Sequence, residues 1–200
     1  MTLRFVVAIA CAIAAVPVHA GGSGQLALES ARVSLDGTSS LHPYSASTTT
    51  VRLVNAELAG ESLDAALRAG ALKAFDIAIP VATLTSPREG IDKNMHKSLA
   101  SSRHPDITFR LTTLMALEPA GPDGQPLRAA GVLTIAGTAR EVILDLKARQ
   151  NGQQMTVSGT IDLVMTDYGI KPPTAMLGML KTDPKVTVTF EIVLTTPSAG

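Results

Sequence analysis

Apolar and polar residues alternate along most of the chain after its first twenty positions, which is the pattern of β-strands with one buried face. Turn signals such as Gly137 and Asn151-Gly152 separate the alternating runs, as they do in hairpins. About eight strands joined by short turns predict an antiparallel meander. The apolar positions of these runs fall within residues 31–35, 51–53, 75–81, 107–111, 133–135, 142–146, 155–165 and 186–194.

One segment changes its period midway. Ile91, Met95 and Leu99 recur every fourth residue, as they would on one face of a short helix. Pro105 then ends the helix, and Ile107–Leu111 alternates as a strand does. A single short helix in an otherwise all-β chain predicts a barrel or sandwich with a lid, which is the architecture of a container.

Three further segments depart from regular alternation. The polar run Ser45–Thr50 leads into Leu53, which predicts one long strand whose first half is exposed or lines something polar. Glu61–Gly70 has the composition of a helix and ends in glycine, so we expect a helical turn or two there. Tyr168–Lys181 contains two glycines and two prolines and predicts a loop, with a short apolar turn at Met176–Leu180.

Residues 1–20 have the layout of a secretory signal peptide. Arg4 precedes an apolar run over residues 5–16, and small residues at 18–20 form a cleavage pattern. The apolar run is too short for a comfortable membrane span. We therefore expect a periplasmic protein without a stable membrane anchor, whose residues 21–200 form a single domain with no internal repeat or interdomain linker.

The sole cysteine, Cys11, lies inside this leader, so the mature chain would contain no disulfide, thiol nucleophile or zinc–thiolate site. Lipid attachment at Cys11 is the minor alternative, because too little apolar sequence precedes it. Lys and Arg together number 17, as do Asp and Glu, and aromatic residues make up only 3%. This balance argues against a nucleic-acid surface, which requires clustered cations and stacking rings.

The sequence carries no motif that points to an enzyme or a cofactor. It has no G-x-S-x-G elbow, and Gly131 and Gly137 bracket a hairpin instead of a phosphate-binding loop. The aspartates fall at turns and on polar strand faces, where no pair of carboxylates stands out. We expect a non-enzymatic protein without a cofactor.

Closing eight antiparallel strands into a barrel would remove exposed sheet edges. A barrel of that size either fills with its own side chains or holds one small ligand. The apolar halves of the strands are mostly Val, Ile, Leu, Met and Ala, and the chain has only four Phe, two Tyr and no Trp. Such slim aliphatic walls suit a long, flexible apolar ligand, although a filled core uses the same residues and remains open as an alternative.

Several segments, in their order along the chain, match the motifs of one known family: Gly37–His42, Ala82–Thr85, Ile91–Leu99, His104–Phe109, Gly131–Arg140 and Asp167–Ile170. In these segments the chain resembles the YceI-like family, a group of periplasmic lipocalin-like barrels that bind polyisoprenoid or other amphiphilic lipids. The resemblance spans nearly the whole mature chain, and the hairpin G-V-L-T-I-A-G-T-A-R is its most specific element. The chain departs from the family in lacking Trp, in carrying Met165-Thr166 where an Arg is common, and in an Ala-rich insert at 56–71.

This resemblance implies an all-β, antiparallel lipocalin-like barrel with a short capping helix. It implies a periplasmic binding or carrier protein for an amphiphilic ligand of isoprenoid or fatty-acyl type, and it leaves a homodimer open. The expected ligand-binding residues are apolar strand positions, helix positions and one tyrosine: Leu53, Phe75, Ile77, Ile79, Met95, Leu99, Ile107, Phe109, Val142, Leu144, Met165 and Tyr168.

Three histidines, His42, His96 and His104, are the expected polar contacts of the site. Three imidazoles could also form a zinc or copper site, but no two of them have the i, i+4 spacing of a local pair. We expect each of them to bond a backbone carbonyl or a polar neighbour near the barrel mouth. A histidine-based metal or redox accessory protein and a filled barrel that serves as an interaction module are the alternative functions.

Tyr168 combines an apolar ring with a hydroxyl that needs a partner, which suits the place where a lipid head meets its tail. Gly169 beside it permits a tight bend that would aim the ring. Packing beneath the Pro172-Pro173 loop is the equally weighted alternative.

Overall fold

The computed structural model describes residues 23–24, 26–59, 67, 71–118, 121–175 and 180–196. The predicted signal peptide with Cys11, nearly all of the predicted helical segment 61–70 and most of the predicted turn 176–180 lie outside the described residues. Within the described residues, no helix is both long and apolar enough to cross a membrane.

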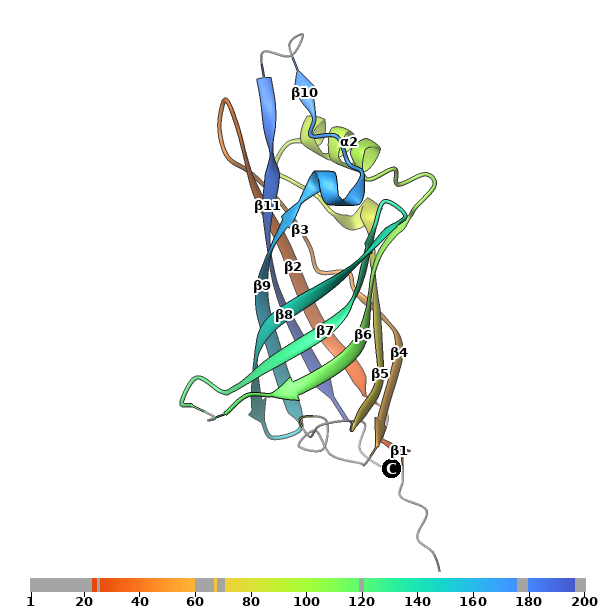
Figure 1. Ribbon diagram of the computed structural model, residues 1–200, viewed down its shortest axis with the longest axis vertical. Helices are drawn as coiled ribbons and strands as arrows, with labels where there is room; N and C mark the ends of the chain where they lie inside the picture. The colour runs from red at the N-terminus through yellow and green to blue at the C-terminus, as the bar shows by residue number, and fades with distance from the viewer. Residues whose placement is uncertain are drawn as a thin grey trace, which may run out of the picture.

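The alternating runs form an antiparallel barrel (Figure 1). Three short strands, β1 (Ser23–Gly24), β3 (Tyr44–Thr48) and β10 (Thr174–Ala175), accompany the long ones. The fold class predicted from the sequence is confirmed. The long strands are β2 (Ala27–Ser39), β4 (Arg52–Ala59), β5 (Leu72–Pro80), β6 (Asp106–Ala116), β7 (Gln125–Ile135), β8 (Thr138–Asn151), β9 (Gln154–Val164) and β11 (Leu180–Thr195).

The strands follow one another in the order β1-β4-β5-β6-β7-β8-β9-β11-β2-β3, and β10 pairs with β11. Among the described residues, no ladder joins β3 to β4. Two backbone hydrogen bonds between Ser47 and Thr85, of 2.8 and 3.0 Å, tie β3 to the segment after β5 instead. This bridge spans the seam of the barrel at the end close to the lid.

The prediction of one long strand over residues 45–53 is wrong, because β3 ends at Thr48 and β4 begins at Arg52. The Thr50 backbone N–H donates to the Thr48 hydroxyl over 3.0 Å, and this local bond competes with the strand ladder. In β3, Ala46 and Thr48 are buried, so the polar run does not stay wholly at the surface.

The expected helix is present as α2 (Glu89–Ser98), with Leu99 as its C-cap, and lies across one end of the barrel (Figure 1). Its first turn carries Glu89 and Asp92 and its last turn carries Lys97, an arrangement that the helix dipole favours. The Ser86 backbone N–H donates to the Asp92 carboxylate over 2.7 Å, which fixes the entry to the helix.

Two short 3-10 helices, η1 (Val81–Thr83) and η2 (Met165–Tyr168), follow strands at the end where α2 lies. The β7–β8 hairpin turns through Ala136 and Gly137, whose φ angles are 49° and 80°. Positive φ at both central residues is what a two-residue type I′ hairpin requires. The hairpin predicted around Gly137 is therefore present.

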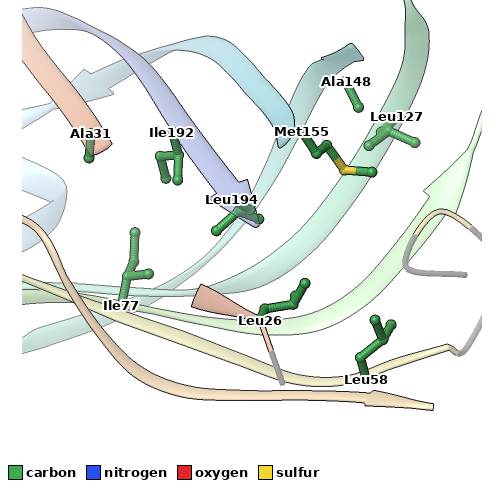
Figure 2. Packing of buried hydrophobic residues seen from close by; sticks show 9 residues of the cluster. All are labelled: Leu26, Ala31, Leu58, Ile77, Leu127, Ala148, Met155, Ile192 and Leu194. Atoms are coloured by element: carbon green, nitrogen blue, oxygen red, sulfur yellow. The ribbon is translucent and has the colours of Figure 1, made fainter. Parts of the chain in front are cut away.

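The main hydrophobic core lies at the end of the barrel away from α2, where Figure 2 shows side chains from several strands pointing inward. Leu58 and Leu127 are almost completely buried there. Burial of a side chain of this size contributes about 1.5–3 kcal/mol. This cluster closes the far end of the barrel, while a smaller cluster of Ile135, Tyr168 and Ile170 lies near the lid.

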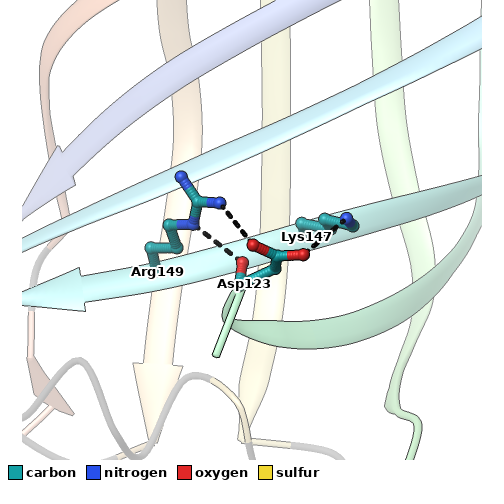
Figure 3. Close-up of polar contacts among 3 residues, drawn as sticks. All are labelled: Asp123, Lys147 and Arg149. Carbon is teal, nitrogen blue, oxygen red and sulfur yellow. Dashed lines mark hydrogen bonds and ion pairs between the residues drawn. The ribbon is translucent and has the colours of Figure 1, made fainter. Parts of the chain in front are cut away.

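Charged residues lie on the outer faces of the strands and at their turns. In the turn between β6 and β7, the Asp123 carbonyl accepts a hydrogen bond of 2.7 Å from Arg149 Nε, and the Asp123 carboxylate lies 3.5 Å from Arg149 Nη2 (Figure 3). Lys147 Nζ lies 4.0 Å from the same carboxylate. Exposed pairs of this kind contribute only about 0–1 kcal/mol each, so burial inside the barrel dominates its stability.

Candidate ligand-binding site

The barrel encloses an inner chamber of about 200 Å³ between its strands. Every described residue that lines it is apolar, and seven of the eight long strands contribute, with β4 as the exception. This composition follows from the sequence pattern, because inward positions of a strand recur at every second residue. A space of this kind has no partner for a polar group and favours hydrocarbon.

An outer chamber of about 270 Å³ adjoins the inner one beneath α2. It combines apolar side chains of α2 and η2 with polar groups, and none of the described residues that line the two chambers is Asp or Glu. The polar members are Ser39, His42, Tyr44, Asn94, Ser98, Tyr168, Thr174, Lys181 and Thr182. Six residues line both chambers, which are therefore continuous: Leu35, Leu84, Ile107, Ile135, Leu163 and Val188.

The structure places most of the expected ligand-binding residues on the walls of these chambers. Met95, Leu99, Met165 and Tyr168 line the outer chamber. Their contact with a ligand stays a prediction. The expected residues that line the inner chamber are Phe75, Ile77, Ile79, Ile107, Phe109, Val142 and Leu144.

Leu53 is the one expected apolar residue that lines neither chamber. It is half-buried on β4 and packs against the main core cluster. The pairing of β4 with β5 shifts between Leu53 and Asn55, so the regular inward–outward alternation breaks at this point.

Two glycines keep aromatic rings against the wall of the inner chamber. A Cβ atom at Gly131 would lie 2.5 Å from the Phe109 ring, and one at Gly159 would lie 2.8 Å from the Phe190 ring. Glycine in a strand often marks such close packing. The two rings therefore cover their neighbouring strands and leave more of the barrel centre open than they would beside larger residues.

The three histidines contact separate neighbours. His96 Nε2 lies 2.8 Å from the Leu84 carbonyl, and a Cβ atom at Gly137 would lie 2.4 Å from the His104 ring. His42 Nε2 accepts from Arg88 Nη1 over 2.8 Å, and Nδ1 lies 3.1 Å from the Pro43 carbonyl. Of the three, His42 alone lines the outer chamber. In the part of the chain that the structure describes, no three His, Cys, Asp or Glu side chains are grouped to hold a metal ion.

Tyr168 in η2 is only 4% exposed and packs with Ile135 and Ile170, while its side chain also lines the outer chamber. Burial raises the pKa of its phenol, and Asp167 adds to this increase while Arg140 opposes it. Gly169 ends η2 with a φ of 69°, the left-handed conformation that glycine allows. The ring thus packs against Ile135 and Ile170 and also forms part of the chamber wall, while its expected packing beneath the Pro172-Pro173 loop stays a prediction.

The model of the YceI-like domain matches residues 29–194. The chain belongs to the YceI-like family. This match spans every long strand as far as Leu194 except the first two residues of β2. It includes every described residue that lines either chamber except Leu26. A search of curated protein sequences finds no significant match.

Solved structures of the YceI-like fold superpose on most of the chain. BcnA of Burkholderia cenocepacia is 17% identical, with a TM-score of 0.63 over 82% of this chain and 95% of that protein. A polyisoprenoid-binding domain from Saccharophagus degradans, implicated in plant cell wall breakdown, is 10% identical, with a TM-score of 0.60 over 87% and 99%. The YCEI protein of Campylobacter jejuni is 12% identical, with a TM-score of 0.54 over 99% and 100%. At these identities the likeness shows the shared fold.

Proposed function

We propose that this YceI-like protein is a periplasmic binding or carrier protein for an amphiphilic molecule of isoprenoid or fatty-acyl type. The ligand's apolar tail occupies the inner chamber, and its polar end lies in the outer chamber beneath α2. The observation that carries this proposal is the continuity of a wholly apolar chamber with one that also has polar walls. The polyisoprenoid-binding domain of Saccharophagus degradans, which has the same fold, supports the isoprenoid class.

The energetics fit a reversible carrier. Each methylene transferred from water into an apolar chamber contributes about 0.8 kcal/mol, so a tail of modest length supplies most of the affinity. The polar outer chamber then orients the ligand without having to hold it alone. Binding in this way requires neither a cofactor nor a catalytic group.

Native mass spectrometry of protein purified from its own periplasm tests the proposal. We expect a bound species of low polarity that is extracted by organic solvent. We also expect the intact mass of the protein to equal that of a chain that begins at Gly21, after cleavage of the leader. A protein recovered from the cytoplasm with its leader attached would contradict the localisation. A protein that carries a metal ion and no lipid would contradict the carrier function and favour the histidine-based alternative.

Replacement of Tyr168 by Phe tests whether its hydroxyl contacts the ligand. The substitution keeps the ring that packs with Ile135 and removes only the hydroxyl. We expect ligand affinity to fall by the value of one hydrogen bond, about 0.5–1.5 kcal/mol, with the fold unchanged. A calorimetric or fluorescence titration with the natural ligand measures this difference. Unchanged affinity would leave Tyr168 as a packing residue only.

A further inference from the structure

The end of the barrel that carries α2 differs in charge from the rest of the molecule. We define this lid end as the connections between strands there together with the β10–β11 hairpin, which are the described residues within 40–43, 81–105, 136–137 and 165–181 (Figure 1). It holds six Lys and Arg residues and three carboxylates, a net charge of +3 with histidine neutral. The other described residues hold nine and twelve, a net charge of −3. The molecule is therefore polarised along the barrel.

The cations of the lid end form no ion pair within the described part of the chain. The six ion pairs found there all join residues outside the lid end, on the strands or in the turn that contains Asp123. Every cation of the lid end is also exposed, so its charge is available to an anionic surface. These cations are Arg88, Lys93, Lys97, Arg103, Lys171 and Lys181.

Leu41 exposes an apolar side chain at the same end. It lies at the tip of the β2–β3 hairpin and is 64% exposed. The Ser39 hydroxyl accepts hydrogen bonds from the backbone N–H groups of Leu41 and His42, over 3.3 and 3.2 Å. The Ser40 N–H donates to the Lys181 carbonyl over 2.9 Å, and the Lys181 N–H donates to Ser40 Oγ over 3.1 Å. These bonds hold the tip in a conformation that leaves Leu41 in solvent.

The residues around Leu41 also border the ligand site. Ser39, His42 and Lys181 line the outer chamber. A surface that contacts the tip of this hairpin therefore lies beside the outer chamber. A single exposed leucine is common in proteins, so Leu41 gains its meaning from the unpaired cations and the chamber next to it.

We propose that the lid end docks on an anionic phospholipid bilayer, with Leu41 inserted at the boundary between headgroups and acyl chains and the unpaired cations beside the lipid phosphates. This inference rests on the proposed function, because a carrier of amphiphilic molecules has to exchange its ligand with a bilayer. Basic residues beside an apolar side chain bind membrane interfaces in this way. The net charge of −3 on the rest of the molecule favours approach with the lid end first.

A bilayer fits this surface better than an acidic protein or a nucleic acid does. All three would attract the cations. Only the bilayer also offers an apolar layer to a single side chain at a protruding hairpin tip, which is where Leu41 lies.

Co-sedimentation of the purified protein with lipid vesicles tests the proposal. One set of vesicles contains phosphatidylcholine alone, and the other contains equal parts of phosphatidylcholine and phosphatidylglycerol. We expect binding to the mixed vesicles to be at least about tenfold stronger. Raising the salt concentration from about 0.01 M to about 0.15 M shortens the Debye length from about 30 to about 8 Å and should weaken this binding.

A double variant, Lys97→Gln with Lys171→Gln, tests the role of the cations. Neither residue lines a chamber, so ligand retention should persist. Binding to the mixed vesicles should fall about 25-fold, because each cation near such a surface contributes about fivefold. Arg32→Gln with Lys73→Gln is the matched control, since it removes two exposed, unpaired cations from β2 and β5 outside the lid end. The control should bind vesicles as the wild-type protein does.

Leu41→Ser tests the apolar contact. Binding to the mixed vesicles should fall about tenfold or more, while its salt dependence stays unchanged. Ile143→Ser is the matched control, because Ile143 is 65% exposed on β8, outside the lid end. It should leave vesicle binding unchanged. All of these substitutions replace exposed side chains, so we expect melting temperatures close to that of the wild-type protein.

Equal binding to both kinds of vesicle would overturn the docking surface, as would equal losses in a lid-end variant and its control. Capture of an acidic protein or a nucleic acid by a protein that does not bind the mixed vesicles would also overturn it. Native mass spectrometry separates this inference from the proposed function. A protein that retains lipid but does not bind vesicles would lose only the docking surface. A protein that binds vesicles through the lid end but carries no lipid would lose the carrier function.

Discussion

Enlarging Ala129 should weaken ligand binding strongly while the barrel stays folded. Ala129 is 1% exposed on β7 and lines the inner chamber. In a series Ala129→Val, Leu and Phe, each larger side chain takes space from the chamber of about 200 Å³ that we assign to the ligand. The Phe variant should lose roughly 100-fold in affinity, the value of three to four methylenes of tail contact.

The free energy of unfolding should rise or stay unchanged in the same series. Filling an empty apolar cavity commonly adds about 0.5–2 kcal/mol to the free energy of unfolding. Native mass spectrometry measures ligand retention across the series, and thermal denaturation of the delipidated protein measures stability. The two measurements together distinguish a hollow barrel from a filled one.

Ala130→Phe is the matched control, because the next residue of a strand points to the opposite face. Ala130 is half-buried on the outer surface, opposite the exposed Ile143 of β8. The control should bind ligand as the wild-type protein does. If each step at Ala129 instead cost the 1–3 kcal/mol typical of overpacking and ligand binding persisted, the barrel would be filled and the interaction-module alternative would gain support.

Period-two alternation was enough to predict the barrel and much of its inner wall. Phe75, Ile77 and Ile79 line the inner chamber because a strand in a closed barrel has one inward face, whatever its neighbours are. The same rule holds for Val188 and Phe190 of β11, which the candidate residues omitted although they alternate in the same way. The alternation along each strand therefore predicts most of the residues that line the inner chamber.

The alternation could not reveal where the pattern breaks or what the outer chamber contains. Leu53 leaves the wall because of a register shift, which depends on how β4 pairs with β5. Tyr44 precedes a polar run and has no local sign of burial. Its phenol becomes a buried, unpartnered donor only because Gly37, seven residues earlier, lies opposite it across the β2–β3 pairing. Polar sites assembled from paired strands depend on register, which a single sequence does not display.

Whether the interior is hollow also lies beyond the sequence pattern. A filled core and a chamber wall use the same aliphatic residues, so composition left both open. Whether the centre of the barrel stays open depends in part on aromatic rings that pack against glycines of neighbouring strands. Phe109 lies over Gly131 and Phe190 over Gly159, and these contacts hold the two rings at the wall. Such pairs follow from tertiary register, not from the order of residues along one strand.

Met95→Asp should open the lid and weaken both ligand binding and stability. Met95 is half-buried on α2, and its side chain lines the outer chamber. A carboxylate there would face an apolar wall, lie one turn from Asp92, and oppose the dipole near the C-terminal end of the helix. We expect a loss of about 1–3 kcal/mol in the free energy of unfolding and at least about a tenfold loss of ligand affinity.

Two variants separate the effect of the lid from that of charge or shape. Met95→Leu keeps an apolar side chain of similar volume and should cost less than about 1.5 kcal/mol, with ligand retained. Lys93→Asp also makes the helix more negative, but Lys93 is exposed and lines neither chamber, so ligand binding should persist. Because α2 covers the outer chamber through Ile91, Met95 and Leu99, ligand release in Met95→Asp should also become faster in a stopped-flow exchange assay. A Met95→Asp protein that kept the wild-type melting temperature and release rate would show that α2 does not retain the ligand.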